Sequence, residues 1–527
     1  MKAFLMYADC DLSLDEKPPL NTEDLTKDLG LQVLFEAMSQ EDEFLFDVSR
    51  RVVLGNTGTP EQILYRQRIL ADCLASPDIV REVYRVVVEG IAKEKRIWGW
   101  MSVDYPMSTL HRAIEVLELF SGVLVRLRQI ADQHGPSFHS DGFRRLFAML
   151  ASELNDEYLE TISEHLHRLR FRGGLLMSAK LGQGNRIRNF VLRKPPRLRE
   201  GWLERLQDWV SQLRQKGEPS YFYEIADRDE AGASALSELR NRSITGVAEA
   251  LAQSTDHILG FLKMLRAELG FYIACLNLHD RLARKGEPIC IPSPSQAGQP
   301  VFTAHGLYDP CLSLNMEERV IGNDVSADDR TLVMITGANR GGKSTLLRSM
   351  GLAQLMMQCG MFVAAESFRA SVCWRVFTHF KREEDTAMQS GKLDEELSRM
   401  RIIVDMVVPH SLVLLNESFA STNEREGSEI ARQIVRALLE SRMKVFYVTH
   451  LFDLASSFHE ARSESAVFLR AERRSDGDRT FRLLEGEPLP TSYGEDLYRR
   501  IFLEGDIKPA GVAGSTGGNG TAPMQNN

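Results

Sequence analysis

The stretch Gly337-Ala338-Asn339-Arg340-Gly341-Gly342-Lys343-Ser344 has the spacing G-x-x-x-x-G-K-[ST]. An apolar run typical of a buried strand, residues 332–336, precedes it, and a helical pattern over 345–357 follows it. Strand, glycine loop and helix are the context in which this spacing predicts a phosphate-binding loop, and a chance match on a glycine-rich turn is the weaker alternative. Loop N–H groups and the helix N-terminus attract phosphate oxygens, so Lys343 is expected to reach the β- and γ-phosphates of ATP and Ser344 to ligate Mg²⁺. The expected nucleotide contacts are Gly337, Ala338, Asn339, Arg340, Gly341, Gly342, Lys343, Ser344 and Thr345.

Two further apolar runs end in polar residues. Residues 411–415 lead into Asn416 and Glu417, and residues 445–448 lead into Thr449 and His450. We expect Asn416 to support Mg²⁺, Glu417 to polarise the attacking water, and His450 to sense the γ-phosphate. Each residue alone would more often be an ordinary surface residue, but their shared position at strand ends favours a catalytic role for Glu417 and His450.

Together these segments resemble the ATPase domain of the MutS family, a group of ABC-type ATPases. The matching segments are 336–345, 416–431, 449–450, 305–307, 309–310, 321–324 and 492–494. The resemblance is specific from about residue 303 to 500 and rests on helical pattern alone from 25 to 300. It implies nucleotide contacts from Ile321 and Asn323. It also implies a homodimer in which Ser390 of one chain completes the ATP site of the other.

The chain departs from the family pattern at three places. Asn416 stands where the family has Asp, so the metal site loses a negative charge and the ATPase rate is expected to be lower. The expected signature loop, residues 389–393, lacks the family's Ser-Thr, which weakens the assignment of Ser390. Val320 stands where the family places an aromatic ring on adenine, so stacking on the base would be lost there.

Composition places the chain among ordinary globular proteins. It has 527 residues, 43% hydrophobic and 26% charged, with a formal net charge of −9, which predicts two to four domains. The acidic balance does not favour nucleic-acid binding overall, although a local basic patch would suffice. The seven cysteines are scattered without metal-binding spacing and are expected to be reduced thiols of a cytoplasmic, conceivably nucleoid-associated, protein. We expect no signal peptide and no membrane span.

The predicted fold is an α/β P-loop ABC-type ATPase domain, preceded by a mostly α-helical core and lever region with a small β-containing clamp. No mismatch-reading domain is expected upstream of the helical region. The expected boundaries are an N-terminal arm (1–24), the helical core and lever (25–170), a basic clamp-like β segment (171–230), return lever helices (231–287), a linker (288–302), the ATPase domain (303–506) and a disordered tail (507–527).

The clamp segment carries the one concentrated positive charge. Between Arg168 and Arg199 there are ten Lys or Arg and no Asp or Glu. The alternatives are a DNA- or RNA-binding surface, which would bind phosphates without reading sequence, and a solvated basic face or one docked on an acidic neighbour. The expected DNA contacts are Lys180, Arg186, Arg188, Arg193 and Lys194.

Three functions compete. The first is a dimeric MutS-like ATPase with ATP and Mg²⁺, whose nucleotide cycle moves helical levers around structured or damaged DNA without standard mismatch recognition, alongside repair or recombination proteins. The second is a nucleotide-gated scaffold with weak hydrolysis that binds a protein partner, which Asn416 favours. The third, a transporter ATPase, lacks any sign of membrane coupling.

Overall fold

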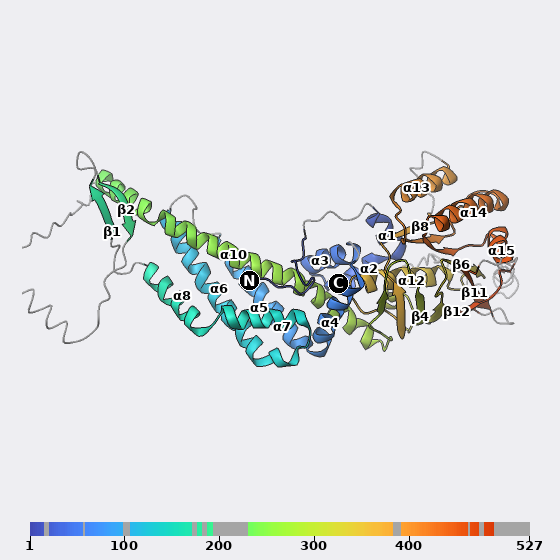
Figure 1. Ribbon diagram of the computed structural model, residues 1–527, viewed down its shortest axis with the longest axis horizontal. Coiled ribbons are helices and arrows are strands. Elements are labelled where there is room, and N and C mark those ends of the chain that lie inside the picture. The colour runs from blue at the N-terminus through green and yellow to red at the C-terminus, as the bar shows by residue number, and fades with distance from the viewer. Residues whose placement is uncertain are drawn as a thin grey trace, which may run out of the picture. The chain divides into compact units, whose positions relative to one another are not determined.

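The computed structural model describes ten ranges of the chain: residues 1–14, 21–55, 58–98, 106–170, 177–181, 187–192, 230–382, 391–461, 464–473 and 479–489. The chain forms two compact units. A helical unit groups residues 1–18, 35–281 and 359–361, and an α/β unit groups residues 19–34, 282–358 and 362–527. Figure 1 labels the elements of both.

The helical unit is built from amphipathic helices. They are α3 (Glu43–Leu54), α4 (Pro60–Ala75), α5 (Pro77–Trp98), α6 (Pro106–His134), the 3₁₀ turn η1 (Gly135–Ser137), α7 (Asp141–Glu153), α8 (Asp156–Leu169) and the long α10 (Glu230–Arg284). Helix α2 (Leu31–Ser39) contains the boundary between the units. Helix α4 begins at Pro60 because the Thr59 side chain accepts a hydrogen bond from Gln62 N, the Gln62 side chain accepts one from Thr59 N, and proline suits the first turn.

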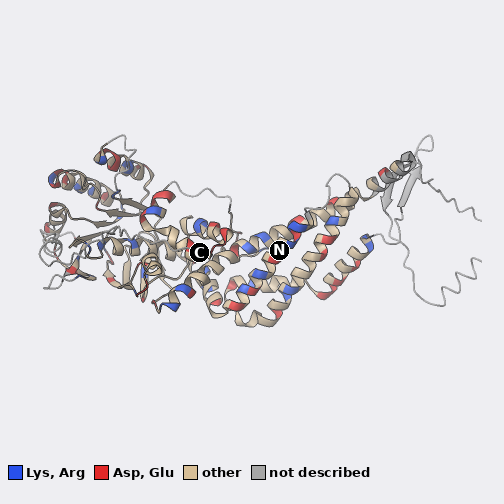
Figure 2. Ribbon diagram, turned by 180° about the vertical axis from the view of Figure 1, so that it is seen from behind, with Lys and Arg blue, Asp and Glu red and all other residues tan. Residues whose placement is uncertain are grey.

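The core of this unit lies between helices that are far apart in sequence. Apolar residues of α6, α8 and α10 form one buried cluster: Leu110, Ile114, Leu117, Leu166, Ile244 and Ala248. Helices α6 and α10 run alongside one another in Figure 1. At 1.5 Å per residue, the 55 residues of α10 span about 80 Å. Acidic and basic residues are interspersed along the described helices of this unit (Figure 2).

A small antiparallel hairpin follows α8. Strand β1 (Met177–Leu181) pairs with β2 (Ile187–Leu192), and Lys180 and Arg188 are register partners. The hairpin lies in the basic segment where the sequence predicts β structure. Residues 193–229 of that segment lie outside the described residues.

The α/β unit is organised by a largely parallel sheet. Its strands in chain order are β6 (Leu332–Gly337), β8 (Val376–Phe380), β9 (Leu412–Asn416), β10 (Lys444–Val448), β11 (Ala466–Arg473) and β12 (Arg479–Glu485). Their order in the sheet is β12-β11-β6-β10-β9-β8, and β12 is antiparallel to β11 while the other neighbours are parallel. Because both faces are covered, the strands read as nearly continuous apolar runs.

Helices cover the two faces of this sheet. Helices α13 (Lys392–Met406), α14 (Glu424–Glu440) and α15 (Phe452–Glu460) pack on one face, around Met334, Leu415 and Tyr447. Helix α12 (Lys343–Gln358) packs against β6, β9 and β10 from the other face, and α1 (Thr22–Leu29) contacts both α12 and β8. Figure 1 shows α12 and α14 on opposite sides of the strands.

A second, mixed sheet adjoins α12. Its order is β3-β7-β4-β5, with β3 (Ser293–Ser295), β4 (Phe302–Leu307), β5 (Asn323–Ser326) and β7 (Ser367–Ser371), and the short helix α11 (Pro310–Asn315) follows β4. The proline-rich segment that the sequence assigns to a linker therefore contains a strand, β3, because β7 offers it a parallel partner.

The two compact units group some residues across the predicted domain boundaries, which stay predictions. Residues 19–34, placed by the sequence partly in the arm and partly in the helical core, group with the α/β unit because α1 packs on β8. The tail from residue 507 lies outside the described residues. Within the described ranges, no helix is both long and apolar enough to cross a membrane. The α/β unit thus combines a largely parallel sheet with helices on both of its faces.

Candidate functional site

The predicted site residues lie at one edge of the parallel sheet. Strands β6, β10 and β9 are neighbours, and Val448 is the register partner of both Ile335 and Asn416. Because these strands are parallel, their carboxyl ends meet at the same edge. The loop after β6, Asn416 at the end of β9, and His450 just beyond β10 are therefore brought together as the sequence predicts.

The loop from Gly337 to Gly342 is shaped by residues with positive φ. The φ angles of Gly337 (107°), Arg340 (60°) and Gly342 (90°) are positive. Glycine adopts positive φ without steric cost, which suits the two glycines to these positions. A Cβ on Gly342 would lie 3.3 Å from the carbonyl oxygen of Phe481 on β12, so any side chain there would be crowded. Asn339 and Arg340 are exposed, and Ala338 is buried.

Lys343 is the first residue of α12 and is almost fully buried. Its ammonium group donates hydrogen bonds to the carbonyl oxygens of Gly337 (2.8 Å) and Ala338 (3.0 Å). Burial lowers the pKa of Lys343, and the nearby Arg479 acts in the same direction, whereas Glu417 raises it. The Lys343 side chain therefore folds back over the loop of residues 337–342, within reach of a ligand bound in that loop.

Ser344 and Asn416 are in direct contact. The Ser344 hydroxyl donates a hydrogen bond to the Asn416 side-chain oxygen Oδ1 over 3.0 Å. The two residues are 72 positions apart, and both had been assigned to the metal from sequence. Hydroxyl, amide and phosphate oxygens suit Mg²⁺, so this oxygen pair fits that ion. Within the described ranges no cluster of His, Cys, Asp and Glu could hold a metal by itself, so an ion here would also need oxygens from a bound phosphate.

Glu417 and His450 form the other half of the site. The Nδ1 atom of His450 lies 3.4 Å from Oε1 of Glu417, and both side chains are about 30% exposed. Burial, Lys343 and Lys381 hold the pKa of His450 below its usual range, although Glu417 acts in the opposite direction. His450 is thus held neutral near pH 7, able to donate one hydrogen bond beside the carboxylate.

The turn that carries Glu417 is strained and firmly held. Glu417 and Phe419 have positive φ values of 53° and 64°, a conformation that costs free energy in non-glycine residues. Behind them, buried Ser418 accepts or donates a 2.7 Å hydrogen bond with His379, and its carbonyl accepts one from the Tyr447 hydroxyl. Glu396 of α13 accepts from Phe419 N (2.9 Å) and from Ser421. This network holds the backbone turn that follows Glu417.

A cavity of about 180 Å³ opens beside the loop. Its lining comes from both halves of the site: Thr336, Gly337, Glu424, Thr449, His450, Leu451, Phe452, Ala455, Pro488 and Leu489. The Thr336 hydroxyl is buried there and has no hydrogen-bond partner among the described residues.

The two predicted contacts upstream of the loop have different surroundings. Ile321 is exposed (42%). Asn323 is buried, and its side chain uses both ends of its amide: Nδ2 donates to Phe481 O (3.1 Å) and Oδ1 accepts from Leu483 N (2.7 Å). This placement favours a positioning role for Asn323, which ties β5 to β12 beside the loop.

Sequence reasoning missed two residues of β12. Phe481 has a positive φ of 58°, is 48% exposed and has its backbone against Gly342, so it offers an aromatic ring where Val320 does not. Arg479 donates a hydrogen bond to Asn339 O over 3.4 Å and adds a cation beside Lys343. Phe481 and Leu483 are two positions apart, as in a strand with one apolar face, so the sequence could have predicted a strand here. It could not have predicted that this strand lies beside the glycine loop.

Several predicted residues lie outside the described part of the chain. Ser390 and residues 492–494 belong to this group, as do Arg186, Arg193 and Lys194. Lys180 and Arg188 are described only through the backbone pairing of β1 and β2. Their predicted contacts with a partner chain or with DNA stay predictions.

Comparison with known proteins relates the two units to one group of proteins. Residues 58–285 match the family described as MutS2 N-terminal domain, and residues 333–503 match MutS domain V. The probable DNA mismatch repair protein Msh6 of Drosophila melanogaster is 33% identical over 175 residues, which are 32% of this chain and 14% of that protein. Endonuclease MutS2 of Thermus thermophilus is 33% identical over 193 residues, 36% of this chain and 25% of that protein. The chain therefore matches a quarter or less of the length of these relatives.

Proposed function

Because this chain belongs to the MutS family, we propose that it is an ATP-hydrolysing, DNA-binding protein whose nucleotide site lies at the carboxyl ends of β6, β9 and β10. The observation that carries the proposal is the meeting of four polar groups from three separate segments. Ser344 contacts Asn416 at 3.0 Å, and Glu417 contacts His450 at 3.4 Å, both beside the glycine loop.

Each residue has a role that its surroundings support. Lys343 exchanges its two carbonyl partners for β- and γ-phosphate oxygens of ATP. Ser344 and Asn416 would hold Mg²⁺, which neutralises charge on the phosphates. Glu417 accepts a hydrogen bond from the attacking water and orients it toward the γ-phosphorus. His450 lies beside Glu417, with Nδ1 3.4 Å from Oε1, and in its neutral form it has one N–H, which would donate toward the γ-phosphate.

The aromatic ring of Phe481 is suited to the nucleotide base. Its backbone lies beside Gly342 and accepts a hydrogen bond from Asn323, and its side chain is half exposed. Stacking on an aromatic ring would compensate for the aliphatic Val320. The base-binding residues would then be Phe481 and Ile321, with Asn323 positioning the strand.

DNA is the proposed macromolecular partner. One relative is named as a DNA mismatch repair protein and the other as an endonuclease. In this chain the proposed contact is the basic segment around β1 and β2, which would bind backbone phosphates independently of sequence. We further propose a homodimer in which Ser390 completes the partner's nucleotide site.

A second candidate is a nucleotide-gated scaffold with weak hydrolysis and a protein partner. Asn416 favours it, because an amide brings no charge to the metal site. The two functions are separated by measuring ATP binding and steady-state turnover with and without a panel of duplex, branched and looped DNA. Turnover that DNA stimulates supports the ATPase. Tight ATP binding with turnover that no DNA changes, and without DNA binding, supports the scaffold.

A further inference from the structure

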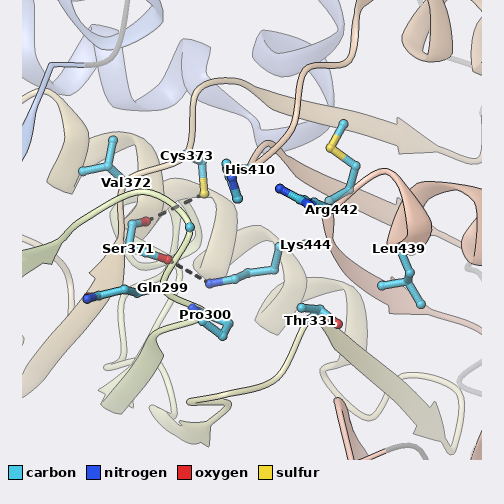
Figure 3. A pocket seen from close by; sticks show the side chains of 12 residues that line it. Gln299, Pro300, Thr331, Ser371, Val372, Cys373, His410, Leu439, Arg442 and Lys444 are labelled. Carbon is cyan, nitrogen blue, oxygen red and sulfur yellow. Dashed lines mark hydrogen bonds between the residues drawn. The ribbon is translucent and has the colours of Figure 1, made fainter.

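A second cavity, of about 260 Å³, lies at the opposite edge of the parallel sheet (Figure 3). Thr331 precedes β6, His410 precedes β9, and Lys444 is the first residue of β10, so the cavity is at the amino ends of the strands whose carboxyl ends carry the nucleotide site. Five residues of extended strand separate the two edges by about 16 Å. The cavity is therefore distinct from the proposed nucleotide site.

Three basic side chains line this cavity: His410, Arg442 and Lys444. Figure 3 shows the ends of His410 and Arg442 facing one another, with Lys444 extending from its strand toward Ser371. No carboxylate is among the lining residues, all of which are described. In the described part of the chain, Arg442 and His410 have no side-chain hydrogen bond or ion pair. The lining therefore carries a net positive charge.

Lys444 is the deepest of the three. It is 8% exposed, and its ammonium donates to Val301 O (3.0 Å) and to Ser371 Oγ (3.1 Å), which leaves its third proton for another acceptor. Burial lowers the pKa of Lys444, and the charge of Asp328 raises it. The Asp328 carboxylate does not bond to Lys444, because it accepts a hydrogen bond from Phe302 N and pairs with Arg369. A buried cation without a directly bonded anion is costly unless something else compensates for it.

The loops that present Arg442 and His410 are held in an unusual conformation. Both residues have positive φ values, 60° and 65°, and His410 N donates to Arg442 O over 2.9 Å. The imidazole packs on Gly298, where a Cβ would lie 3.2 Å from its Cε1 atom. Strained non-glycine residues of this kind persist where the surroundings hold them and often accompany binding sites.

The remaining walls are mostly apolar. Pro300, Val372, Leu439 and Met443 contribute aliphatic surface. A cavity of about 150 Å³ accommodates a benzene ring, so 260 Å³ has room for such a ring together with an oxyanion. Arginine pairs with both oxygens of a carboxylate or phosphate through its planar fork, which suits Arg442 at the mouth.

From this combination we propose that the cavity is a binding site for a small organic oxyanion, a carboxylate or phosphate ester with an apolar or aromatic body. Arg442 and His410 bind the anionic group at the mouth, Lys444 supplies the cation behind them, and the aliphatic walls cover the body of the ligand. This site is independent of the nucleotide site and of its proposed function.

Calorimetric titration with phenyl phosphate and benzoate tests the proposal, with benzyl alcohol as the uncharged probe. Both oxyanions are expected to bind once per chain, and the tighter of the two identifies the head group. Arg442→Gln removes the charge and keeps a non-glycine residue at the same positive φ. It is expected to weaken binding about tenfold or more. Lys444→Met should do the same, whereas Arg436→Gln, an exposed arginine of α14, should have no effect.

Lys343→Ala distinguishes this site from the phosphate loop. Binding of the oxyanions should persist in Lys343→Ala and be lost in Arg442→Gln. The proposal is overturned if benzyl alcohol binds as tightly as benzoate, if neither oxyanion binds, or if Lys343→Ala abolishes binding while Arg442→Gln leaves it intact.

Discussion

The α/β unit and the helical unit place their polar groups in different ways. In the α/β unit the candidate site is assembled from residues next to strand ends, such as Ser344, Asn416 and His450. In the helical unit, Glu268 lies within the long helix α10 and accepts hydrogen bonds from Leu5 N (2.6 Å) and Leu12 N (2.9 Å), more than 250 residues away. Sheet topology brings strand ends together by rule, whereas a helix face can meet any segment of suitable shape.

The largest expected difference between the units concerns ATP binding. Lys343→Ala removes the cation that faces the phosphates and is expected to abolish ATP binding, measured by fluorescence with a labelled nucleotide. The matched change Lys263→Ala, at an exposed lysine of α10, should leave affinity unchanged. Equal affinity in the two variants would contradict the assignment of residues 337–345 to the nucleotide.

Hydrolysis should depend on a single carboxylate of the α/β unit. Glu417→Gln keeps the size and the 3.4 Å contact with His450 but removes the group that orients water, so turnover is expected to fall about 10²- to 10⁴-fold with binding retained. Steady-state phosphate release checks this. Glu440→Gln, an exposed residue at the end of α14, is the control. Normal turnover in Glu417→Gln would show that another group activates the water.

Much of this site could be predicted from sequence because its residues adjoin strands. The spacing of 337–344 and the apolar runs before Asn416 and His450 predict that these polar residues lie together, and Ser344 does contact Asn416 in the structure, while their roles stay predictions. Phe481 and Arg479 could not be found in this way, because their proximity to Gly342 and Asn339 depends on how β12 pairs with β11.

In the helical unit, sequence periodicity predicted helices but not their partners. The start of α4 at Pro60 followed from its capping residues. The bond between Tyr272 and Leu5 O (2.6 Å) and the contacts of Glu268 left no local pattern in the sequence. The grouping of residues 19–34 with the α/β unit was missed for the same reason, since α1 is an ordinary amphipathic helix until β8 is placed.

The two units are expected to respond to pH in opposite directions. Burial lowers the pKa of His379 in the α/β unit to about 4, and burial raises that of Glu268 in the helical unit to about 7. His379 therefore contributes stability that is present above pH 6.5 and lost as the pH falls through 4. Glu268 contributes stability that is present below pH 4.5 and lost as the pH rises through 7. Each shift corresponds to about 3 kcal/mol.

Urea unfolding between pH 4 and 7.5 measures these contributions. His379→Gln should flatten the loss of stability of the α/β unit at low pH, and Glu268→Gln should flatten the loss in the helical unit at high pH. Peptide-level hydrogen exchange would assign each change to its unit. A common pH dependence in both units, unaffected by either substitution, would show that other groups dominate.

DNA binding is expected to depend on the basic segment of the helical unit. Arg186→Ala with Arg188→Ala should weaken binding uniformly across sequences, and the slope of log affinity against log salt should shrink by up to about 0.9 per lost duplex phosphate contact. Arg50→Ala with Arg68→Ala removes two exposed arginines from described helices of the same unit and is the control. If both pairs leave affinity and slope unchanged, the basic segment is a solvated face.

The smallest expected effect concerns Asn416, where this chain departs from the family pattern. Its Oδ1 atom accepts the Ser344 hydroxyl over 3.0 Å, and a carboxylate of the same shape would keep that bond while adding a negative charge beside the metal. Asn416→Asp should therefore lower the Mg²⁺ concentration needed for half-maximal hydrolysis. Turnover itself need not rise, because a second carboxylate next to Glu417 favours protonation of that residue and makes it a poorer acceptor.

An Mg²⁺ titration of ATPase activity in both forms measures this shift. Asn423→Asp is the matched control, because it adds the same charge at the N-cap of α14, where Asn and Asp are equally good caps. A shift of the Mg²⁺ titration curve in Asn416→Asp alone would show that the residue at the end of β9 contributes to the metal site. Identical curves for all three proteins would mean that the contact between Ser344 and Asn416 only joins α12 to β9, and that the charge missing at position 416 has no bearing on the metal.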